Sequence, residues 1–412
     1  MKKIVLLLSL LVFFFAPNVA ADDDLALTAK GAIAVDANTG KILYEKEADK
    51  SMPVGSITKL LTAYLVYEAV AEGKLSWQTP IEISDYPYQL TFEKEIANIP
   101  LDNRKYTVKE LLEVSLVYNA NSPAIALAEA VAGNESKFVD QMKAKLSSWG
   151  VKNAKIVNAS GVKNSYLGDH IYSGSSKDDE NELSAYAVAV IANRLIKDYP
   201  EVLKITQKTS INFEGNDLTS YNYMLEGMSR FRAGVDGLHT GNTEQGESLV
   251  TTSNERGMRL MTIILNTDNP DHDIYARFTE MNRLMTYINQ HFVATTLVKK
   301  GESYGKKDAT IIDGATDTVR PVAKEDLVIV ERIGTQDVTP IHFHTKKEGY
   351  LAPIKKNQTL GSLTFTDKQL VGHGYLQSRM PEVDMVAEKG IKKAIAPKLW
   401  WNHFVNYVNE KL

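Results

Sequence analysis

The sequence contains no cysteine among its 412 residues. This absence excludes a disulfide framework, a cysteine nucleophile and a zinc site built from cysteine ligands. The chain also lacks an excess of basic residues, because its formal net charge at pH 7 is -4. No strongly basic stripe interleaved with aromatic residues occurs along it either. We therefore expect no nucleic-acid partner.

Long apolar runs are scarce as well, and the most marked one lies near the N-terminus. It covers residues 4–15, follows Lys2 and Lys3, and is succeeded by small residues up to Ala21. About 12 apolar residues are too few for a transmembrane helix, but they match the central region of a secretory signal peptide. We predict that residues 1–21 form such a signal peptide and that the protein is exported.

The overall composition, with 44% hydrophobic and 24% charged residues, is that of a globular protein. Helical and strand patterns mix up to about residue 292, which predicts an α+β domain over residues 22–292. A polar surface loop is expected at 173–182. The elements expected in this domain are a hairpin at 32–46, helices at 56–72, 108–118, 122–131, 184–197 and 271–292, and strands at 249–253 and 259–266.

Short β-rich runs separated by turn residues follow after this point, and they predict a small all-β domain over residues 293–385. Two histidines, His342 and His344, share one face of such a run. A metal pair is one interpretation of them, but a plain strand surface is favoured because no carboxylates lie nearby at ligand spacing. We therefore expect no metal site and no cofactor.

The last segment, residues 386–412, has the pattern of an amphipathic helix. Apolar residues recur every three or four positions from Ile391 onwards, and lysines cluster where the pattern begins. The adjacent Trp400 and Trp401 are costly to leave in water. Interfacial aromatic residues with basic flanks are typical of a helix that lies in a membrane surface. We predict a membrane-surface anchor; the alternative is a terminal helix docked on the protein.

A candidate nucleophile lies at the start of a helical pattern. Ser56 and Lys59 lie three residues apart in the stretch Val-Gly-Ser-Ile-Thr-Lys-Leu-Leu. At this spacing on a helix the two side chains share a face, with Cβ atoms about 5–6 Å apart. Lys59 can act as base for the Ser56 hydroxyl if its pKa is lowered, which a helix N-terminus favours. Serine before a helix is also a common cap, so this pair alone leaves both interpretations open.

Two later stretches favour the nucleophile. The first is residues 118–122, Tyr-Asn-Ala-Asn-Ser, between two predicted helices; the second is residues 235–243, Val-Asp-Gly-Leu-His-Thr-Gly-Asn-Thr, which run into a predicted strand. In order and spacing, the three stretches resemble the Ser-x-x-Lys, Ser-x-Asn and Lys-Thr-Gly motifs of the serine penicillin-recognising enzymes. The chain is most similar to the low-molecular-weight D-alanyl-D-alanine carboxypeptidases. This resemblance covers nearly the whole mature chain and implies a β-lactamase/transpeptidase-like catalytic domain, in which helices flank an antiparallel sheet.

The resemblance implies a role for each residue of the first two motifs. Ser56 would attack the carbonyl of the penultimate D-alanine and form an acyl-enzyme. Lys59 would be its base, and Asn121 would orient the substrate amide and the lysine. Asn119 stands where the family has a serine. An asparagine hydrogen-bonds but cannot relay a proton as a hydroxyl does, so Lys59 would carry more of the proton transfer to the leaving amine.

The third motif implies the substrate-binding residues. His239 and Thr240 would face the terminal carboxylate, and Gly241 would keep the strand open for an extended substrate. The backbone N–H groups of Asn242 and Ser56 would form the oxyanion hole. His239 replaces the lysine of the family motif. Because a histidine with a pKa near 6.5 is only partly charged at neutral pH, we expect substrate capture to weaken as pH rises.

The resemblance therefore implies an enzyme that removes the terminal D-alanine from peptidoglycan stem peptides and is acylated by β-lactam antibiotics. It would work at the extracytoplasmic face of a bacterial membrane. Three alternatives stay open: a transpeptidase, a β-lactamase of the same superfamily, and a catalytically weak penicillin- or wall-binding protein. A β-lactamase is disfavoured because no Glu-x-x-Leu-Asn string lies between Asn121 and His239.

Overall fold

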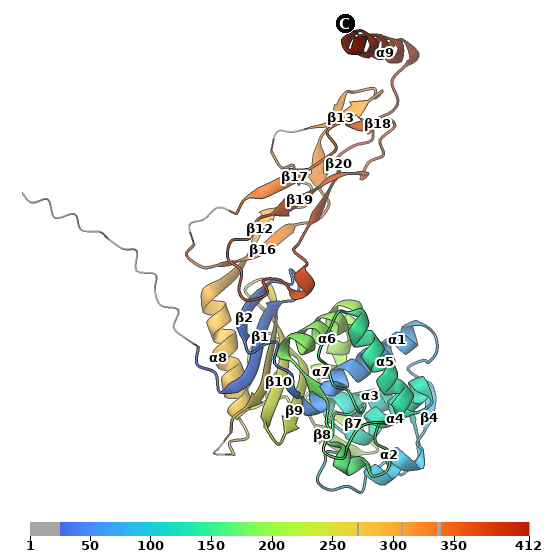
Figure 1. Ribbon diagram of the computed structural model, residues 1–412, viewed down its shortest axis with the longest axis vertical. Coiled ribbons are helices and arrows are strands. Elements are labelled where there is room, and N and C mark those ends of the chain that lie inside the picture. The colour runs from blue at the N-terminus through green and yellow to red at the C-terminus, as the bar shows by residue number, and fades with distance from the viewer. Residues whose placement is uncertain (1–24, 270–271, 306–307, 336–338, 412) are drawn as a thin grey trace, which may run out of the picture.

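The computed structural model describes residues 25–269, 272–305, 308–335 and 339–411. The predicted signal peptide therefore lies outside the described residues. Figure 1 shows an elongated molecule, with helices gathered around a sheet in one part and β-structure in the other. This arrangement confirms the predicted α+β class and the all-β second part.

The sheet of the first part is antiparallel, with five strands in the order β2-β1-β11-β10-β9. Its strands are β1 (Ala29–Asp36), β2 (Ile42–Lys46), β9 (Val235–Thr243), β10 (Gly246–Glu255) and β11 (Met258–Thr267). The expected hairpin is β1 and β2, and the two expected strands are β10 and β11. β9 carries the third motif and lies at the edge of the sheet.

Alternate residues of the strands pack into two hydrophobic cores. Ile33 and Val35 of β1 join the core beneath most of the helices, whereas Ala32 and Ala34 join the core beneath α8 (Ala276–His291). Successive side chains of a strand point to opposite faces, so helices cover the sheet on both sides. The other helices of this part are α1 (Lys59–Ala71), α2 (Asp85–Leu90), α3 (Val108–Val117), α4 (Asn121–Ala132), α5 (Glu135–Ser148), α6 (Ala185–Asp198) and α7 (Leu203–Thr206).

Three local differences from the expected elements bear on the site. The helix expected at 56–72 begins as a 3₁₀ turn, η1 (Gly55–Thr58), and only then becomes α1. Helix α5 was not predicted, although its buried residues Phe138, Met142 and Leu146 have helical spacing. The loop expected on the surface at 173–182 ends in a fully buried asparagine. By contrast, α6 has the expected serine cap.

The second part is built of strands and begins directly after α8. β12 (Phe292–Val298) pairs with β16 (Leu327–Arg332), and two further sheets have the orders β15-β20-β19-β17 and β14-β13-β18. His342 and His344 bond threonine hydroxyls across the sheet, and no cluster of three or more metal-ligating side chains occurs among the described residues. The remaining strands are β13 (Ala309–Ile312), β14 (Thr318–Val319), β15 (Pro321–Ala323), β17 (Ile341–His344), β18 (Tyr350–Leu351), β19 (Thr359–Phe365) and β20 (Val383–Ala387).

The tail ends in helix α9 (Ala396–Lys411), which lies beyond β13 and β18, far from the helical part (Figure 1). The helix begins later than the apolar pattern does. Ile391 and Lys393 instead form isolated β-bridges with Ile354 and Gly314, because backbone groups of the second part are there to pair with them. Within the described ranges, no helix is both long and apolar enough to cross a membrane.

Candidate active site

The proposed nucleophile lies in η1, immediately before α1. The Lys59 amine donates a hydrogen bond to the Ser56 hydroxyl over 2.7 Å. Ser56 is not the cap of α1, because that position belongs to Thr58, which makes no capping bond with its side chain. The tight turn thus places Ser56 beside its neighbouring lysine, and the capping interpretation fails.

Lys59 is buried, with 1% of its surface exposed. Its amine also bonds the side-chain oxygens of Asn121 at 2.7 Å and Asn119 at 3.1 Å, and the carbonyl of Ser160 at 3.2 Å. None of its partners in the described part of the chain is a carboxylate. Burial without a compensating charge lowers the pKa of Lys59 well below its usual value. An uncharged amine at this position can accept a proton from the hydroxyl.

The two asparagines of the second motif approach the lysine from the segment that joins α3 to α4. Asn119 has a φ of 65°, a left-handed conformation that asparagine tolerates better than most residues. Its amide nitrogen reaches the Thr240 carbonyl of β9 at 3.4 Å. Asn121 begins α4, and its amide nitrogen donates to the Ala97 carbonyl at 2.9 Å. The two side chains therefore connect the base to the walls of the site.

The edge strand β9 packs directly on the nucleophile turn, and Gly241 makes this possible. A Cβ atom on Gly241 would lie 2.7 Å from the Val54 carbonyl oxygen and 2.9 Å from a side-chain carbon of Ile57. The family resemblance implied that Gly241 keeps the strand open for an extended substrate to lie alongside. The space beside its α-carbon is filled by the protein itself. Because β9 is the edge strand of its sheet, the expectation that a substrate lies alongside it stays a prediction.

Two cavities meet at Asn119 and Asn242. One, of about 390 Å³, contains Ser56 and Asn121, and the other, of about 340 Å³, contains Thr240. Both include Ala97. Five of the eight residues expected in the site therefore line these cavities, and the sixth, Lys59, bonds three of them. The exceptions are the buried glycine of β9 and His239.

His239 lines neither cavity and is 2% exposed. Its Nδ1 atom lies 3.1 Å from the Leu116 carbonyl. Burial is the main cause that lowers its pKa, to about 3. Burial therefore favours the neutral imidazole, and the structure gives no support to a charged His239 at the substrate carboxylate. The pH dependence expected from its titration gains no support from this geometry either.

Arg277 of α8 supplies a cation that no sequence motif predicted. It lines the 340 Å³ cavity together with Thr240. Its guanidinium group forms an ion pair with Glu247 at 2.8 Å and donates to the Gly241 carbonyl at 3.3 Å. No short motif marks this arginine, because it reaches the site only when α8 crosses the face of the sheet.

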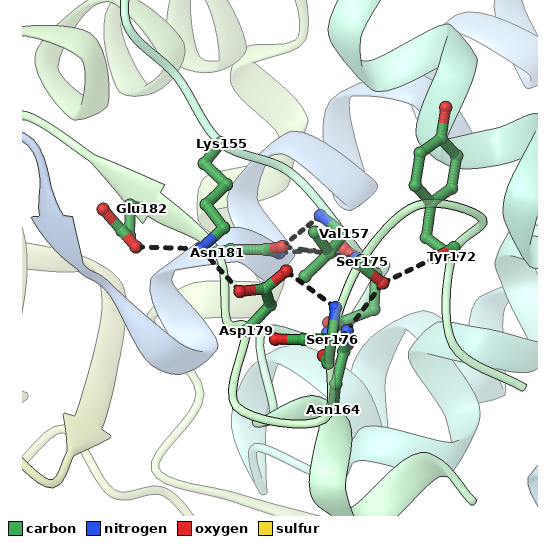
Figure 2. Close-up of polar contacts among 10 residues, drawn as sticks. Lys155, Val157, Asn164, Tyr172, Ser175, Ser176, Asp179, Asn181 and Glu182 are labelled. Carbon is green, nitrogen blue, oxygen red and sulfur yellow. Dashed lines mark hydrogen bonds and ion pairs between the residues drawn. The ribbon is translucent and has the colours of Figure 1, made fainter. Parts of the chain in front are cut away.

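A second missed contribution comes from the loop between α5 and α6. Asn181 is fully buried and donates to the hydroxyl of Thr58 at 3.0 Å and to the Asn158 carbonyl at 2.8 Å. Figure 2 shows the side chain of Asn181 at Val157, with Asp179 and Lys155 joined beside it. The end of this loop thus stabilises the nucleophile turn through the hydrogen bond from Asn181 to Thr58.

Comparison with known proteins agrees with this geometry. A family model described as D-alanyl-D-alanine carboxypeptidase matches residues 17–269. The chain belongs to the D-alanyl-D-alanine carboxypeptidase family. A second model, described as the C-terminal domain of penicillin-binding protein 5, matches residues 292–393. The predicted low-molecular-weight penicillin-binding protein, with its all-β second part, is therefore confirmed.

Individual carboxypeptidases and related structures match most of the chain. The D-alanyl-D-alanine carboxypeptidase DacF of Bacillus subtilis is 25% identical over 96% of each chain. The crystal structure of a peptidoglycan synthesis regulatory factor, PBP3, from Streptococcus pneumoniae is 51% identical, with a TM-score of 0.86 over 89% of this chain and 100% of that one. Penicillin-binding protein 5 from Haemophilus influenzae, at 22% identity and a TM-score of 0.69 over 89% of this chain and 98% of that one, shares the fold. The protein is accordingly a serine-type D-alanyl-D-alanine carboxypeptidase, as predicted.

Proposed function

We propose that this carboxypeptidase removes the terminal D-alanine of peptidoglycan stem peptides through an acyl-enzyme on Ser56. The observation that carries the proposal is the short bond between the Ser56 hydroxyl and a buried lysine amine that has no carboxylate among its bonded partners in the described residues. Burial lowers the pKa of this amine and favours its uncharged form, which is a base, and a hydroxyl beside a base is an activated nucleophile.

The reaction follows from this pair. Lys59 takes the proton of the Ser56 hydroxyl as its oxygen attacks the carbonyl carbon of the penultimate D-alanine. The backbone N–H groups of Ser56 and Asn242 bind the developing oxyanion. Lys59 then returns the proton to the leaving amine, since Asn119 has no hydroxyl to relay it. Water hydrolyses the acyl-enzyme in a second cycle with the same base.

The carboxylate of the departing D-alanine is bound in the 340 Å³ cavity. Arg277 supplies the cation there, and Thr240 supplies a hydroxyl donor. This assignment replaces the role first given to His239, whose buried ring is uncharged. A guanidinium group remains charged throughout the working pH range and suits a planar carboxylate, so binding of this group does not depend on a histidine.

The test of this function is product analysis. A peptide ending in D-Ala-D-Ala is incubated with the enzyme and examined by mass spectrometry. We expect loss of one alanine, whereas a cross-linked product would indicate the transpeptidase alternative. A penicillin that is turned over rapidly would indicate a β-lactamase, and absence of covalent labelling would indicate a weak binder. None of these alternatives is favoured by the relatives.

Arg277→Gln should lower kcat/KM for the free-acid peptide by about 10- to 100-fold, because a buried charge partner of the carboxylate is lost. For the same peptide with a C-terminal amide, the variant should differ from the parent by less than about threefold, since no carboxylate is present. The matched control is Arg283→Gln, an arginine of the same helix whose partner is Glu280. Equal losses on acid and amide would show that Arg277 acts through the fold alone.

The same proposal covers location. Residues 1–21 act as a signal peptide, residues 22–292 form the catalytic domain, residues 293–385 the β-domain and residues 386–412 the anchor. The enzyme is held at the extracytoplasmic membrane surface by α9. In support, four aromatic side chains of α9 are exposed in the structure, between 48% and 68%: Trp400, Trp401, Phe404 and Tyr407.

A chain that ends at Ile395 should lose sedimentation with anionic lipid vesicles and keep full activity on a soluble peptide. The truncation keeps residues 391 and 393, so the second domain retains their β-bridges to Ile354 and Gly314. Substitution of the exposed tryptophans by alanine in the full chain should weaken binding as well. A truncated chain that still binds vesicles would place the membrane contact elsewhere.

A further inference from the structure

A buried carboxyl group near the site has no role in the reaction described so far. Glu135, in the first turn of α5, is 7% exposed. One carboxyl oxygen accepts the backbone N–H of Ala159 at 2.8 Å, and the other accepts the hydroxyl of Tyr86 at 2.9 Å. Both donors are neutral. Burying a carboxyl group without a cation is costly, so its presence calls for a reason.

Through the Ala159 amide, Glu135 is bonded to the turn formed by residues 158–161. The Ala159 carbonyl of this turn accepts the Thr62 hydroxyl at 2.6 Å, and the carbonyl of Ser160 accepts the Lys59 amine at 3.2 Å. Gly161 lies so close to the nucleophile turn that a Cβ atom would be 1.9 Å from the Gly55 carbonyl oxygen. The turn at 158–161 therefore contacts the base Lys59 through Ser160, and it packs against the nucleophile turn through Gly161.

We propose that Glu135 is a positioning residue for acylation: its carboxyl group anchors the turn at 158–161 and thereby holds the Ser160 carbonyl against the Lys59 amine. The inference rests on the roles proposed above for Lys59 and Ser56. A carboxyl group suits the task because it offers an acceptor oxygen to each of two converging donors, the Ala159 amide and the Tyr86 hydroxyl. An apolar side chain would leave both donors unsatisfied.

The surroundings of Glu135 support a geometric role. Burial raises its pKa to about 7, against the lowering effect of its two hydrogen bonds. The titratable groups that face it are Tyr86 of α2, which stacks on His170, and Glu129 of α4. A protonated carboxyl keeps an acceptor oxygen for the Ala159 amide. The anchor therefore persists whether the group is charged or neutral.

The experiment compares Glu135→Ala, Glu135→Asp and Glu135→Gln by their rate of acylation with a fluorescent penicillin between pH 5 and 10. Glu135→Ala should acylate about 10- to 100-fold more slowly, because a small displacement of reacting groups has effects of this size. Glu135→Gln keeps one acceptor oxygen and should stay within about threefold of the parent. Glu135→Asp is too short by one methylene and should behave like the alanine variant.

The pH profile separates positioning from a merely structural effect. Its acidic limb reports deprotonation of Lys59. Loss of the Ser160 carbonyl removes an acceptor that favours the charged amine, so the limb should move to lower pH in Glu135→Ala and stay in place in Glu135→Gln. The matched control is Glu129→Gln, since Glu129 bonds Ser84 and does not touch the turn. It should leave rate and profile unchanged.

Two results would overturn the proposal. One is a folded Glu135→Ala variant with the parent's rate and acidic limb; if this variant does not fold, the same result for Glu135→Asp decides. The other is an equal shift in the Glu129 control. A parent enzyme that penicillin never acylates would instead refute the proposed function, so the two failures are distinguishable.

Discussion

Ser56→Ala should abolish both D-alanine release and covalent labelling by penicillin, with a loss of at least about 10⁴-fold in kcat. Removal of the nucleophile in a serine hydrolase has effects of this size, because the remaining site binds the substrate without forming the covalent intermediate. The fold should be unaffected, since the hydrogen bond that the Ser56 hydroxyl makes within the described residues is the one to Lys59. Release of D-alanine from the synthetic peptide and fluorescence labelling on a gel measure the two losses.

The control for this prediction is Ser160→Ala, a serine in the same part of the site. Its contact with Lys59 is made by the backbone carbonyl, so the substitution should leave most of the activity. If a folded Ser56→Ala variant is labelled at the parent's rate, the nucleophile lies elsewhere and the assignment of Lys59 as its base fails too.

Gly161→Ala should lower the acylation rate by at least about 100-fold and reduce the free energy of unfolding by about 2–4 kcal/mol. The added methyl group would lie 1.9 Å from the Gly55 carbonyl oxygen and 2.7 Å from the Thr58 hydroxyl. No rotation of a flexible side chain relieves a contact with backbone. The turn at 158–161 and the nucleophile turn must separate, which takes the Ser160 carbonyl away from Lys59.

Gly133→Ala is a close control, because Gly133 has nearly the same φ without the contact. Gly133 has a φ of +85° and Gly161 a φ of +86°, but a Cβ atom on Gly133 meets nothing within 4 Å. We expect Gly133→Ala to cost about 1–2 kcal/mol of stability from the left-handed conformation alone, and to leave acylation unchanged. Denaturant unfolding measures the loss of stability, and penicillin labelling measures the acylation rate, so the two effects are separated. Equal behaviour of the variants would mean that packing against Gly55 does not matter.

Part of this site was predictable from residues close together in the sequence. The spacing of Ser56 and Lys59 predicted a contact that the turn and the first residue of α1 do form. The third motif was predicted to run into a strand, and it occupies β9. Ser184 was predicted to cap a helix, and its side chain accepts the N–H of Ala187. Each of these features depends on neighbours within a few positions, so local pattern is sufficient.

The other part was decided by residues far apart in the sequence. His239 meets the carbonyl of Leu116, which lies 123 positions away. Desolvation by such distant neighbours lowers the pKa of the ring, and no sequence motif predicts this burial. Gly241 was assigned to the substrate because its motif implied it, yet its α-carbon faces Val54 and Ile57.

The sequence by itself determined the reactive pair, the order of the motifs, the change from an α+β to an all-β part, and the amphipathic tail. All of these can be predicted from the types of residue and their periodicity along the chain. Tertiary structure alone decided which groups carry charge. It buried Lys59 without a carboxylate partner among the described residues, neutralised His239, and brought Arg277 to the site. It also placed Glu135 behind the turn at 158–161. The physical reason is that a pKa depends on desolvation and nearby charge, and both are set by segments that only folding brings together.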